Sequence, residues 1–241
     1  MPLIRRLLGR LPAPLGDRLS RYGAFHFLST HAALGRAARR GVKVATVLDV
    51  GASDGRWSLD IRPHFPDARY HLIEANRHHA PALERLCAAK PGFSHALAAA
   101  GDAVGEIHFN ADDPFGGVGT RHKGASTITV PMTTLDHEAG RLDLPGPYLV
   151  KLDTHGFEVP ILAGASAVLA RTSVAVIEVY LLRIQPDSLR FHELCAHMEG
   201  LGFLPADLSE PLWRPRDGAL WQFDLVFLRK DAAVFADNGY G

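Results

Sequence analysis

The sequence predicts an α/β fold with a mostly parallel seven-stranded sheet, an antiparallel edge hairpin and an inserted β-hairpin. Three observations support this prediction. Apolar, β-branched runs alternate with helical stretches from residue 44 onward, which is typical of parallel strands joined by helices. A glycine turn follows the first of these runs, as in Rossmann-like domains. Near its end the chain has two strand-like runs joined by a loop, which favour a hairpin at one edge of the sheet.

The chain divides into three parts by charge and hydrophobic pattern. Residues 1–43 form a helical, basic N-terminal extension, residues 44–231 the sheet domain and residues 232–241 a C-terminal tail. Residues 1–45 carry nine lysines and arginines against one acid. The first apolar run is too short, and too interrupted by arginine, for a signal peptide or a membrane span. Residues 1–12 could pack as a solvated helix across the edge of the domain, which the pattern favours, or lie on an anionic membrane surface.

Composition restricts the class of protein and its partners. Hydrophobic residues make up 47% and charged residues 22% of the chain, which is typical of a soluble globular protein. The two cysteines, Cys87 and Cys195, lie in apolar helical patterns and cannot form a disulfide framework or a zinc cluster, so we expect packing thiols in a cytoplasmic protein. The sheet domain is net acidic and lacks a stripe of arginine and aromatic residues, so no nucleic-acid partner is expected.

The first half of the sheet domain shows the alternation in order. Residues 43–50, KVATVLDV, have no polar alternation and predict a buried central strand. A helix over 54–65, a strand over 69–75, a helix over 78–91 and a strand over 93–99 are predicted to follow. The first of these helices is expected to stop near Pro66.

Residues 106–132 break the alternation. EIHFNA, 106–111, and STITVPM, 126–132, both alternate between apolar and polar residues, which predicts a hairpin with a long glycine-rich tip. The tip contains FGGVGT, residues 115–120, but no Gly-Lys-Ser/Thr follows it, so a mobile flap is favoured over a phosphate loop.

The alternation resumes in the second half of the domain. The pattern predicts a strand over 148–153, a helix over 158–170, a strand over 173–180, a helix over 188–202 and two final strands over 203–208 and 219–230. The helix over 158–170 has Pro160 in its first turn, where proline is tolerated, and the helix over 188–202 closes at Gly202.

The glycine turn GASDG, residues 51–55, fits three kinds of site. As G-x-S-x-G it would be a hydrolase nucleophile elbow, but it follows what is predicted to be the first sheet strand, and no suitable acid and histidine follow it. As a dinucleotide turn it has Ser53 in place of the second glycine, and Asp54 would place a carboxylate near the phosphate charge. S-adenosylmethionine carries no phosphate and has a sulfonium cation, so the negative charge of Asp54 would not repel it.

The surroundings of the turn favour S-adenosylmethionine. Asp49 ends the preceding strand, and the small residues Gly51 and Ala52 let the backbone approach a ligand closely. Glu74 ends the second strand, where an acid can accept hydrogen bonds from both ribose hydroxyls. The cofactor interpretation is therefore preferred to the other two.

These residues resemble the FkbM-type methyltransferases, over about residues 44–229. The resemblance is carried by the turn Asp49–Gly55, the acid Glu74, and the segments TLD (134–136), KLDTHGFE (151–158) and ILAGA (161–165). The sequence departs from the family at Ser53, where the family usually has Asn, and at His155, where it usually has Glu or Gln.

The resemblance implies a class I methyltransferase fold and an S-adenosylmethionine-dependent O-methyltransferase. Members of the family modify sugars, glycolipid or polysaccharide units, and secondary metabolites. By position, the resemblance assigns the cofactor to Asp49, Gly51, Ala52, Ser53, Gly55, Glu74, Ala99, Asp102 and Asp153.

The predicted catalytic residues are Asp153, His155 and Glu158, because ligands bind at the carboxyl ends of parallel strands. His155 is the candidate general base, since an imidazole can accept a proton near neutral pH. The alternative is an exposed turn residue with no catalytic role. Asp153 could orient His155, contact the cofactor amine or hold the acceptor. Glu158 could contact substrate or simply favour the start of a helix through its negative charge.

A divalent metal could be bound by Asp153, His155 and Glu178, but the spacing does not require one and none is expected. Tyr180 and the segment 115–120 are acceptor-side candidates, because a closing flap would exclude water. The favoured substrate is a hydroxyl of a sugar, glycan or glycolipid unit. A small secondary metabolite methylated on oxygen or nitrogen, and a non-catalytic cofactor-binding scaffold, remain the alternatives.

Overall fold

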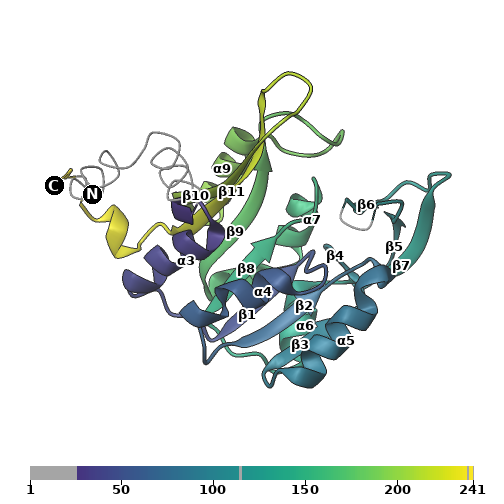
Figure 1. Cartoon of the computed structure of the whole chain (residues 1–241), viewed down its shortest axis with the longest axis horizontal. Helices are drawn as coiled ribbons and strands as arrows, with labels where there is room; N and C mark the ends of the chain where they lie inside the picture. Colours follow the sequence, from purple (N-terminus) through teal and green to yellow (C-terminus); the bar gives the residue numbers. More distant parts are fainter. Residues whose placement is uncertain (1–25, 114–115, 238, 241) are drawn as a thin grey trace, which may run out of the picture.

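The computed structural model describes residues 26–113, 116–237 and 239–240 (Figure 1). Its main sheet has seven strands in the order β10-β11-β9-β8-β1-β2-β3. The five parallel strands are β1 (Thr46–Val50), β2 (Arg69–Ile73), β3 (Phe93–Ala96), β8 (Tyr148–Leu152) and β9 (Thr172–Tyr180). The edge hairpin consists of β10 (Phe203–Trp213) and β11 (Leu220–Arg229), and β11 runs antiparallel to β9. The predicted α/β fold with its antiparallel edge hairpin is confirmed.

The central strands end level with one another. Val50 of β1 lies opposite Ile73 of β2 and Leu152 of β8, and Leu152 in turn lies opposite Ile177 of β9. All five residues of β1 are buried, as the unbroken apolar run predicted. The loops that leave β1, β2 and β8 therefore start along one edge of the sheet.

Helices cover both faces of the sheet. One face packs against α3 (Thr30–Arg39), α4 (Arg56–Ile61) and α5 (Ala80–Ala89), and the other against α6 (Leu135–Arg141), α7 (Glu158–Ala163), α8 (Ser166–Ala170) and α9 (Phe191–Gly200). Short 3-10 turns lie at Arg62–His64, Arg77–His79 and Ala233–Phe235. Alternate residues along a strand pack into the two hydrophobic cores on opposite faces of the sheet. Val47 packs into the core on the side of α3–α5, and Leu48 packs into the core on the side of α6–α9.

A second, four-stranded sheet contains the predicted hairpin insertion. It comprises β4 (Ala99–Ala100), β5 (Gly105–Asn110), β6 (Val118–Thr120) and β7 (Thr127–Thr133), in the order β4-β7-β5-β6. Ile107, Phe109, Val130 and Met132 form its core, with Phe157 packed against them. In Figure 1 this sheet projects beside α7, past the end of the central strands.

The structure corrects two predicted elements. The single strand expected over 93–99 is two strands in different sheets, because β3 pairs with β2 whereas Ala99 pairs with Met132 of β7. The single helix expected over 158–170 is two helices, α7 and α8, separated near Gly164. A Cβ at Gly164 would lie 2.1 Å from the carbonyl oxygen of Gly101, so this close backbone approach requires glycine. The helix α6 had not been predicted.

The N-terminal extension is described only from residue 26. Its helix α3 buries Ala33 and Leu34 completely against the sheet domain. The prediction for residues 1–12 lies outside the described residues. No helix in the described part of the chain is long and apolar enough to cross a membrane. Cys87 and Cys195 are free thiols that pack against the two main cores.

Candidate active site

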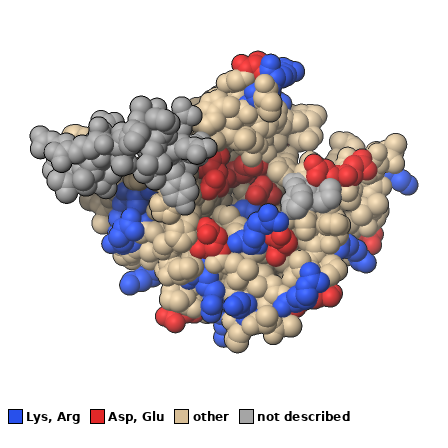
Figure 2. All heavy atoms as spheres, viewed as in Figure 1, with Lys and Arg blue, Asp and Glu red and all other residues tan. Residues whose placement is uncertain are grey.

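A cavity of about 750 Å³ opens where the central strands end, and the second sheet forms one of its walls. The glycine turn after β1 and the ends of β2, β8 and β9 line it, and Phe109, Gly117 and Gly119 face it from the second sheet. Its size falls within the range of small-molecule sites. In the face shown in Figure 2, acidic side chains gather in the central hollow. Four carboxylates and two basic side chains line the cavity: Asp60, Glu74, Asp153, Glu178, Arg56 and Lys151.

The glycine turn forms the floor of the cavity, and its backbone geometry explains its composition. Gly51 has φ +73°, and its N–H donates to the carbonyl of Ile73 at 3.0 Å. A Cβ at Gly51 would lie 2.0 Å from the carbonyl oxygen of Asp153. Both the conformation and the close approach of the β8 end therefore require glycine. Gly55, with φ +82°, instead leaves room for Leu86 and does not line the cavity.

Glu74 is held in place by the turn that it faces. Its Oε2 accepts the Ser53 N–H and its Oε1 accepts the Asn76 N–H, both at 2.7 Å. The side chain is buried yet lines the cavity. A carboxylate has about four acceptor positions, so Glu74 keeps acceptor capacity for two ligand hydroxyls. Ser53, with φ +50°, and Ala52 also line the cavity.

Asp49 lies beneath the floor and does not line the cavity. Its Oδ2 accepts the Ser58 hydroxyl at 2.7 Å, and its Oδ1 lies 3.4 Å from Nζ of Lys151. Lys151 also donates to the carbonyl of Gly51 at 3.1 Å and lies 3.1 Å from Oδ2 of Asp153. Burial opposes the charge of Lys151, but Asp153 and Asp49 outweigh it and raise the Lys151 pKa.

Lys151 was not among the predicted site residues. The sequence did contain a signal for it: Lys151 lies inside an apolar strand, where a buried charge is costly unless acidic groups pair with it. Asp153, which Lys151 contacts, lines the cavity. Burial tends to raise the pKa of Asp153, but the charge and the hydrogen bond of Lys151 oppose it, and the pKa is lowered. Asp153 is therefore a carboxylate at neutral pH.

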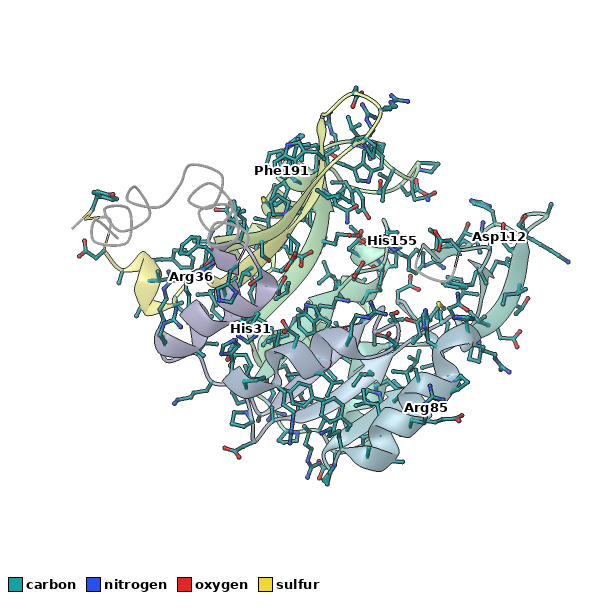
Figure 3. The ribbon with its side chains drawn as sticks, viewed as in Figure 1. His31, Arg36, Arg85, Asp112, His155 and Phe191 are labelled. Carbon is teal, nitrogen blue, oxygen red and sulfur yellow. The ribbon has the colours of Figure 1, made fainter. Side chains whose placement is uncertain are left out.

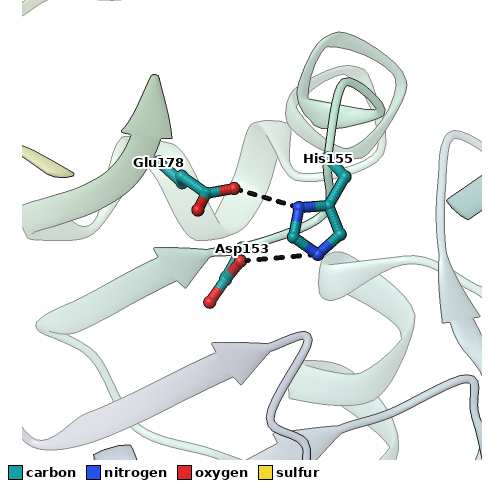
Figure 4. Close-up of side chains that lie close together, drawn as sticks. All are labelled: Asp153, His155 and Glu178. Atoms are coloured by element: carbon teal, nitrogen blue, oxygen red, sulfur yellow. Dashed lines mark hydrogen bonds and ion pairs between the residues drawn. The ribbon is translucent and has the colours of Figure 1, made fainter. Parts of the chain in front are cut away.

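His155 stands between two carboxylates where β8 and β9 line the cavity (Figures 3 and 4). Its φ is +53°, an uncommon backbone conformation for a residue other than glycine. Its Nδ1 lies 3.1 Å from Oε2 of Glu178 and 2.9 Å from the Tyr180 hydroxyl oxygen. Its Nε2 lies 4.0 Å from Oδ1 of Asp153. The structure thus joins Tyr180 to the group of Asp153, His155 and Glu178 that the sequence had considered together.

The hydrogen bonds around Glu178 assign the tautomer of a neutral His155. Tyr180 donates its hydroxyl proton to Oε2 of Glu178, and Gln222 donates to Oε1. Burial and the charge of Glu178 raise the Tyr180 pKa, so the phenol keeps its proton. Both oxygen atoms near Nδ1 are then acceptors, so Nδ1 carries the hydrogen and the lone pair lies on Nε2. Gln222 was not predicted.

Of the remaining predicted site residues, Ala99 lines the cavity, whereas Glu158 and Asp102 do not. Glu158 accepts hydrogen bonds from the Thr154 hydroxyl at 3.1 Å and from the Gly156 N–H at 2.9 Å, at the start of α7. It is buried outside the cavity lining, and burial raises its pKa. Ala99 lines the cavity, as predicted for a residue beside the adenine. Asp102 does not; it pairs with Arg121 of the insertion.

A divalent metal fits the group formed by Asp153, His155 and Glu178 poorly. One ligand atom from each of Asp153, His155 and Glu178 lies within 4.8 Å of the others. However, the ammonium of Lys151 already contacts Asp153, and both oxygens of Glu178 accept protein hydrogen bonds. A cation would have to share these carboxylates with an ammonium and with the hydrogen-bond donors of Tyr180 and Gln222.

S-adenosylmethionine fits the residues that line the cavity after β1 and β2. Glu74 offers acceptors to the ribose hydroxyls, and the predominantly acidic lining suits a sulfonium cation. The small residues Gly51 and Ala52 open the floor to a ligand. In addition, Asn76 lines the cavity and has a buried Nδ2 without a hydrogen-bond partner among the described residues.

Known proteins resemble this chain in both sequence and structure. Residues 49–205 match the sequence family described as the methyltransferase FkbM domain. No curated protein sequence matches. The solved structures that are similar include methyltransferase FkbM from Methylobacillus flagellatus KT, with 17% identity, a TM-score of 0.49, and coverage of 76% of this chain and 43% of that chain. The present chain therefore corresponds to less than half the length of that protein.

Two further structures are similar at lower identity. One is 1,6-didemethyltoxoflavin-N1-methyltransferase from Burkholderia thailandensis, with 14% identity, a TM-score of 0.45, and coverage of 89% of this chain and 86% of that chain. The other is magnesium protoporphyrin IX methyltransferase from Synechocystis PCC 6803, with 9% identity, a TM-score of 0.46, and coverage of 83% and 78%.

Proposed function

The chain belongs to the FkbM family of S-adenosylmethionine-dependent methyltransferases, and on that premise we propose that it methylates a hydroxyl group of a sugar or glycan unit. One observation carries the proposal. A single cavity combines Glu74, which can accept ribose hydroxyls, with His155, whose Nδ1–H is held by Glu178 and Tyr180. The first residue suits the cofactor and the second suits removal of a proton from an alcohol.

When bound, S-adenosylmethionine supplies an electrophilic methyl carbon on a sulfonium. Glu74 would accept hydrogen bonds from the ribose hydroxyls, and the absence of a side chain at Gly51 would let the ligand approach the floor. Asp153 is ionised at the end of β8 and would contribute negative charge that favours a sulfonium in the cavity. These contacts would place the methyl group toward His155.

Nε2 of His155 would take the proton of the acceptor hydroxyl, and the cofactor would supply the methyl group to that oxygen and leave as S-adenosylhomocysteine. Glu178 accepts the Nδ1–H hydrogen bond and stabilises the imidazolium that results. Tyr180 and Gln222 fix the position of the Glu178 carboxylate through the hydrogen bonds that they donate to it. The base is thereby oriented by a buried network.

The walls of the acceptor side favour a sugar. Gln222 and Glu178 line the cavity beside His155 and can bond the hydroxyls of a sugar, and Phe109 and Phe157 add apolar surface to the cavity from the side of the second sheet. The acidic lining disfavours phosphorylated acceptors by charge repulsion. A neutral mono- or oligosaccharide unit therefore suits the cavity.

The test is transfer of a labelled methyl group from S-adenosylmethionine to a panel of neutral sugars and glycans, using the wild type and His155→Gln. We expect transfer to a sugar hydroxyl, and a rate roughly 10²–10⁴-fold lower in His155→Gln with cofactor affinity unchanged. His192→Gln is the matched control, because His192 is exposed on α9. Transfer only to amines or other small metabolites would overturn the substrate proposal. Full activity of His155→Gln would overturn the base, and absence of cofactor binding would indicate a scaffold.

A further inference from the structure

Two side chains of the cavity wall keep a buried N–H group that has no hydrogen-bond partner in the described part of the chain. They are Asn76, at Nδ2, and Trp57, at Nε1. Buried donors are nearly always paired, because removing an unpaired donor from water is costly. Both residues line the cavity that holds Glu74 and Asp153. This combination indicates that a ligand supplies the missing acceptors.

The orientation of the Asn76 amide is fixed by its neighbours. Its Oδ1 accepts the backbone N–H of His78 at 3.0 Å, so the oxygen cannot exchange places with the nitrogen without losing this bond. Its own backbone N–H donates to Oε1 of Glu74 at 2.7 Å. The side chain is 6% exposed. The unpaired amide group thus belongs to the same short segment after β2 as the acid that suits the ribose.

Trp57 belongs to the other end of the cavity. It lies in the first turn of α4, and Nζ of Lys151 lies 5.6 Å from the centroid of its ring. Lys151 is in β8, whereas Glu74 and Asn76 follow β2, and β1 separates these two strands in the sheet. His155, the proposed base, follows β8 as well. Trp57 therefore lies on the side of the reacting group and Asn76 on the side of the ribose.

We propose that the two donors divide recognition of the cofactor: the Asn76 amide donates to the nucleoside, and the Trp57 indole N–H donates to the carboxylate of the methionine end. The inference rests on the proposed function for the identity of the cofactor, and it does not depend on the acceptor. On the β8 side the cofactor offers a sulfonium, an ammonium and a carboxylate, and only the carboxylate accepts hydrogen bonds well. On the β2 side the ribose and adenine offer oxygen and ring-nitrogen acceptors.

Two ligands that differ only in the amino-acid end separate the roles. S-adenosylhomocysteine carries the carboxylate, and 5′-methylthioadenosine lacks the amino-acid end. Calorimetric titration of both into Trp57→Phe, which keeps an aromatic ring and loses the N–H, should show roughly 10-fold weaker binding of S-adenosylhomocysteine and an unchanged affinity for 5′-methylthioadenosine. Asn76→Ser, which keeps an oxygen acceptor for the His78 N–H, should weaken both ligands by a similar factor.

Trp213→Phe serves as the matched control, because Trp213 is exposed on β10 and does not line the cavity. Thermal unfolding of each variant shows whether it is folded at the temperature of the titration. Equal weakening of both ligands by Trp57→Phe, or none, overturns the assignment of Trp57. If Asn76→Ser weakens binding of S-adenosylhomocysteine but not of 5′-methylthioadenosine, the assignment of Asn76 to the nucleoside is overturned. If the wild type binds neither ligand, the proposed function itself fails, and this inference fails with it.

Discussion

Nζ of Lys151 lies 3.1 Å from Oδ2 of Asp153, and this ion pair supports the floor of the cavity. The same ammonium contacts Asp49 of the neighbouring strand and the carbonyl of Gly51. One buried cation therefore ties together β1, β8 and the glycine turn. Since its partners include two carboxylates, its removal would leave buried negative charges without compensation.

Lys151→Met should lower the free energy of unfolding by about 3–5 kcal/mol, because breaking one side of a buried ion pair leaves uncompensated charge. Urea denaturation at pH 7 measures the change. Lys230→Met is the control, since Lys230 is exposed at the end of β11, and it should change stability by less than about 0.5 kcal/mol. Equal stabilities of the two variants would contradict the role of Lys151.

Gly51→Ala and Gly41→Ala separate steric clash from backbone strain. Both glycines have positive φ, +73° and +86°, but a Cβ at Gly41 meets nothing within 4 Å. Gly41→Ala should therefore cost only about 1–2 kcal/mol of backbone strain. Gly51→Ala should cost more than about 4 kcal/mol, because its Cβ would collide with the Asp153 carbonyl, and it should also weaken cofactor binding. Thermal unfolding of both variants tests this, and similar losses would contradict it.

Asp224 should make stability fall as pH rises from about 4 to 7. It lies opposite Glu178 in the sheet and accepts the Thr30 hydroxyl at 2.9 Å. Burial, with the charge of Asp153 as the next cause, raises its pKa from 3.8 to about 7. The folded state therefore binds this proton more tightly than the unfolded state, so the contribution of Asp224 is most favourable below pH 4 and is lost as pH rises through 7.

Asp224→Asn should remove this dependence, since Asn keeps an acceptor for Thr30 and carries no charge. One pKa unit corresponds to about 1.4 kcal/mol, so the variant should gain up to a few kcal/mol relative to the wild type at pH 8 and little at pH 4. Denaturant unfolding at both pH values measures the difference. A variant whose stability gain is the same at pH 4 and pH 8 would show that Asp224 does not titrate in this way.

Removal of divalent metal should leave methyl transfer unchanged within about twofold. Lys151, Tyr180 and Gln222 already bind the carboxylates that a cation would need, so a cation would compete with an ammonium and two hydrogen-bond donors. The measurement is transfer of a labelled methyl group after chelation with EDTA, followed by addition of magnesium. A loss of activity that magnesium restores would assign the Asp153, His155 and Glu178 cluster to a metal instead.

Local pattern was sufficient to place part of the cavity lining, but Asp49, Gly55 and Asp102 do not line the cavity. A strand, a glycine turn and an acid after the next strand are contiguous features, and Gly51 and Glu74 lie where these features place them. The acceptor side was only partly predictable. The sequence grouped Asp153, His155 and Glu178 only as possible ligands of a metal, and nothing in their spacing showed that Glu178 would face Nδ1 of His155. Asn76 and Gln222 were missed, because ordinary amides on a strand end carry no pattern of their own.

The sequence by itself determined the layers of the fold, the order of most elements and the position of the glycine turn, because these follow from hydrophobic period and backbone conformation among neighbouring residues. Tertiary structure alone decided which side chains meet. It placed Asp49 under the floor beside Lys151, divided residues 93–99 between two sheets, and brought Gln222 and Tyr180 to Glu178. Such contacts join residues from different strands, and their energies depend on distance and burial in space rather than on separation along the chain.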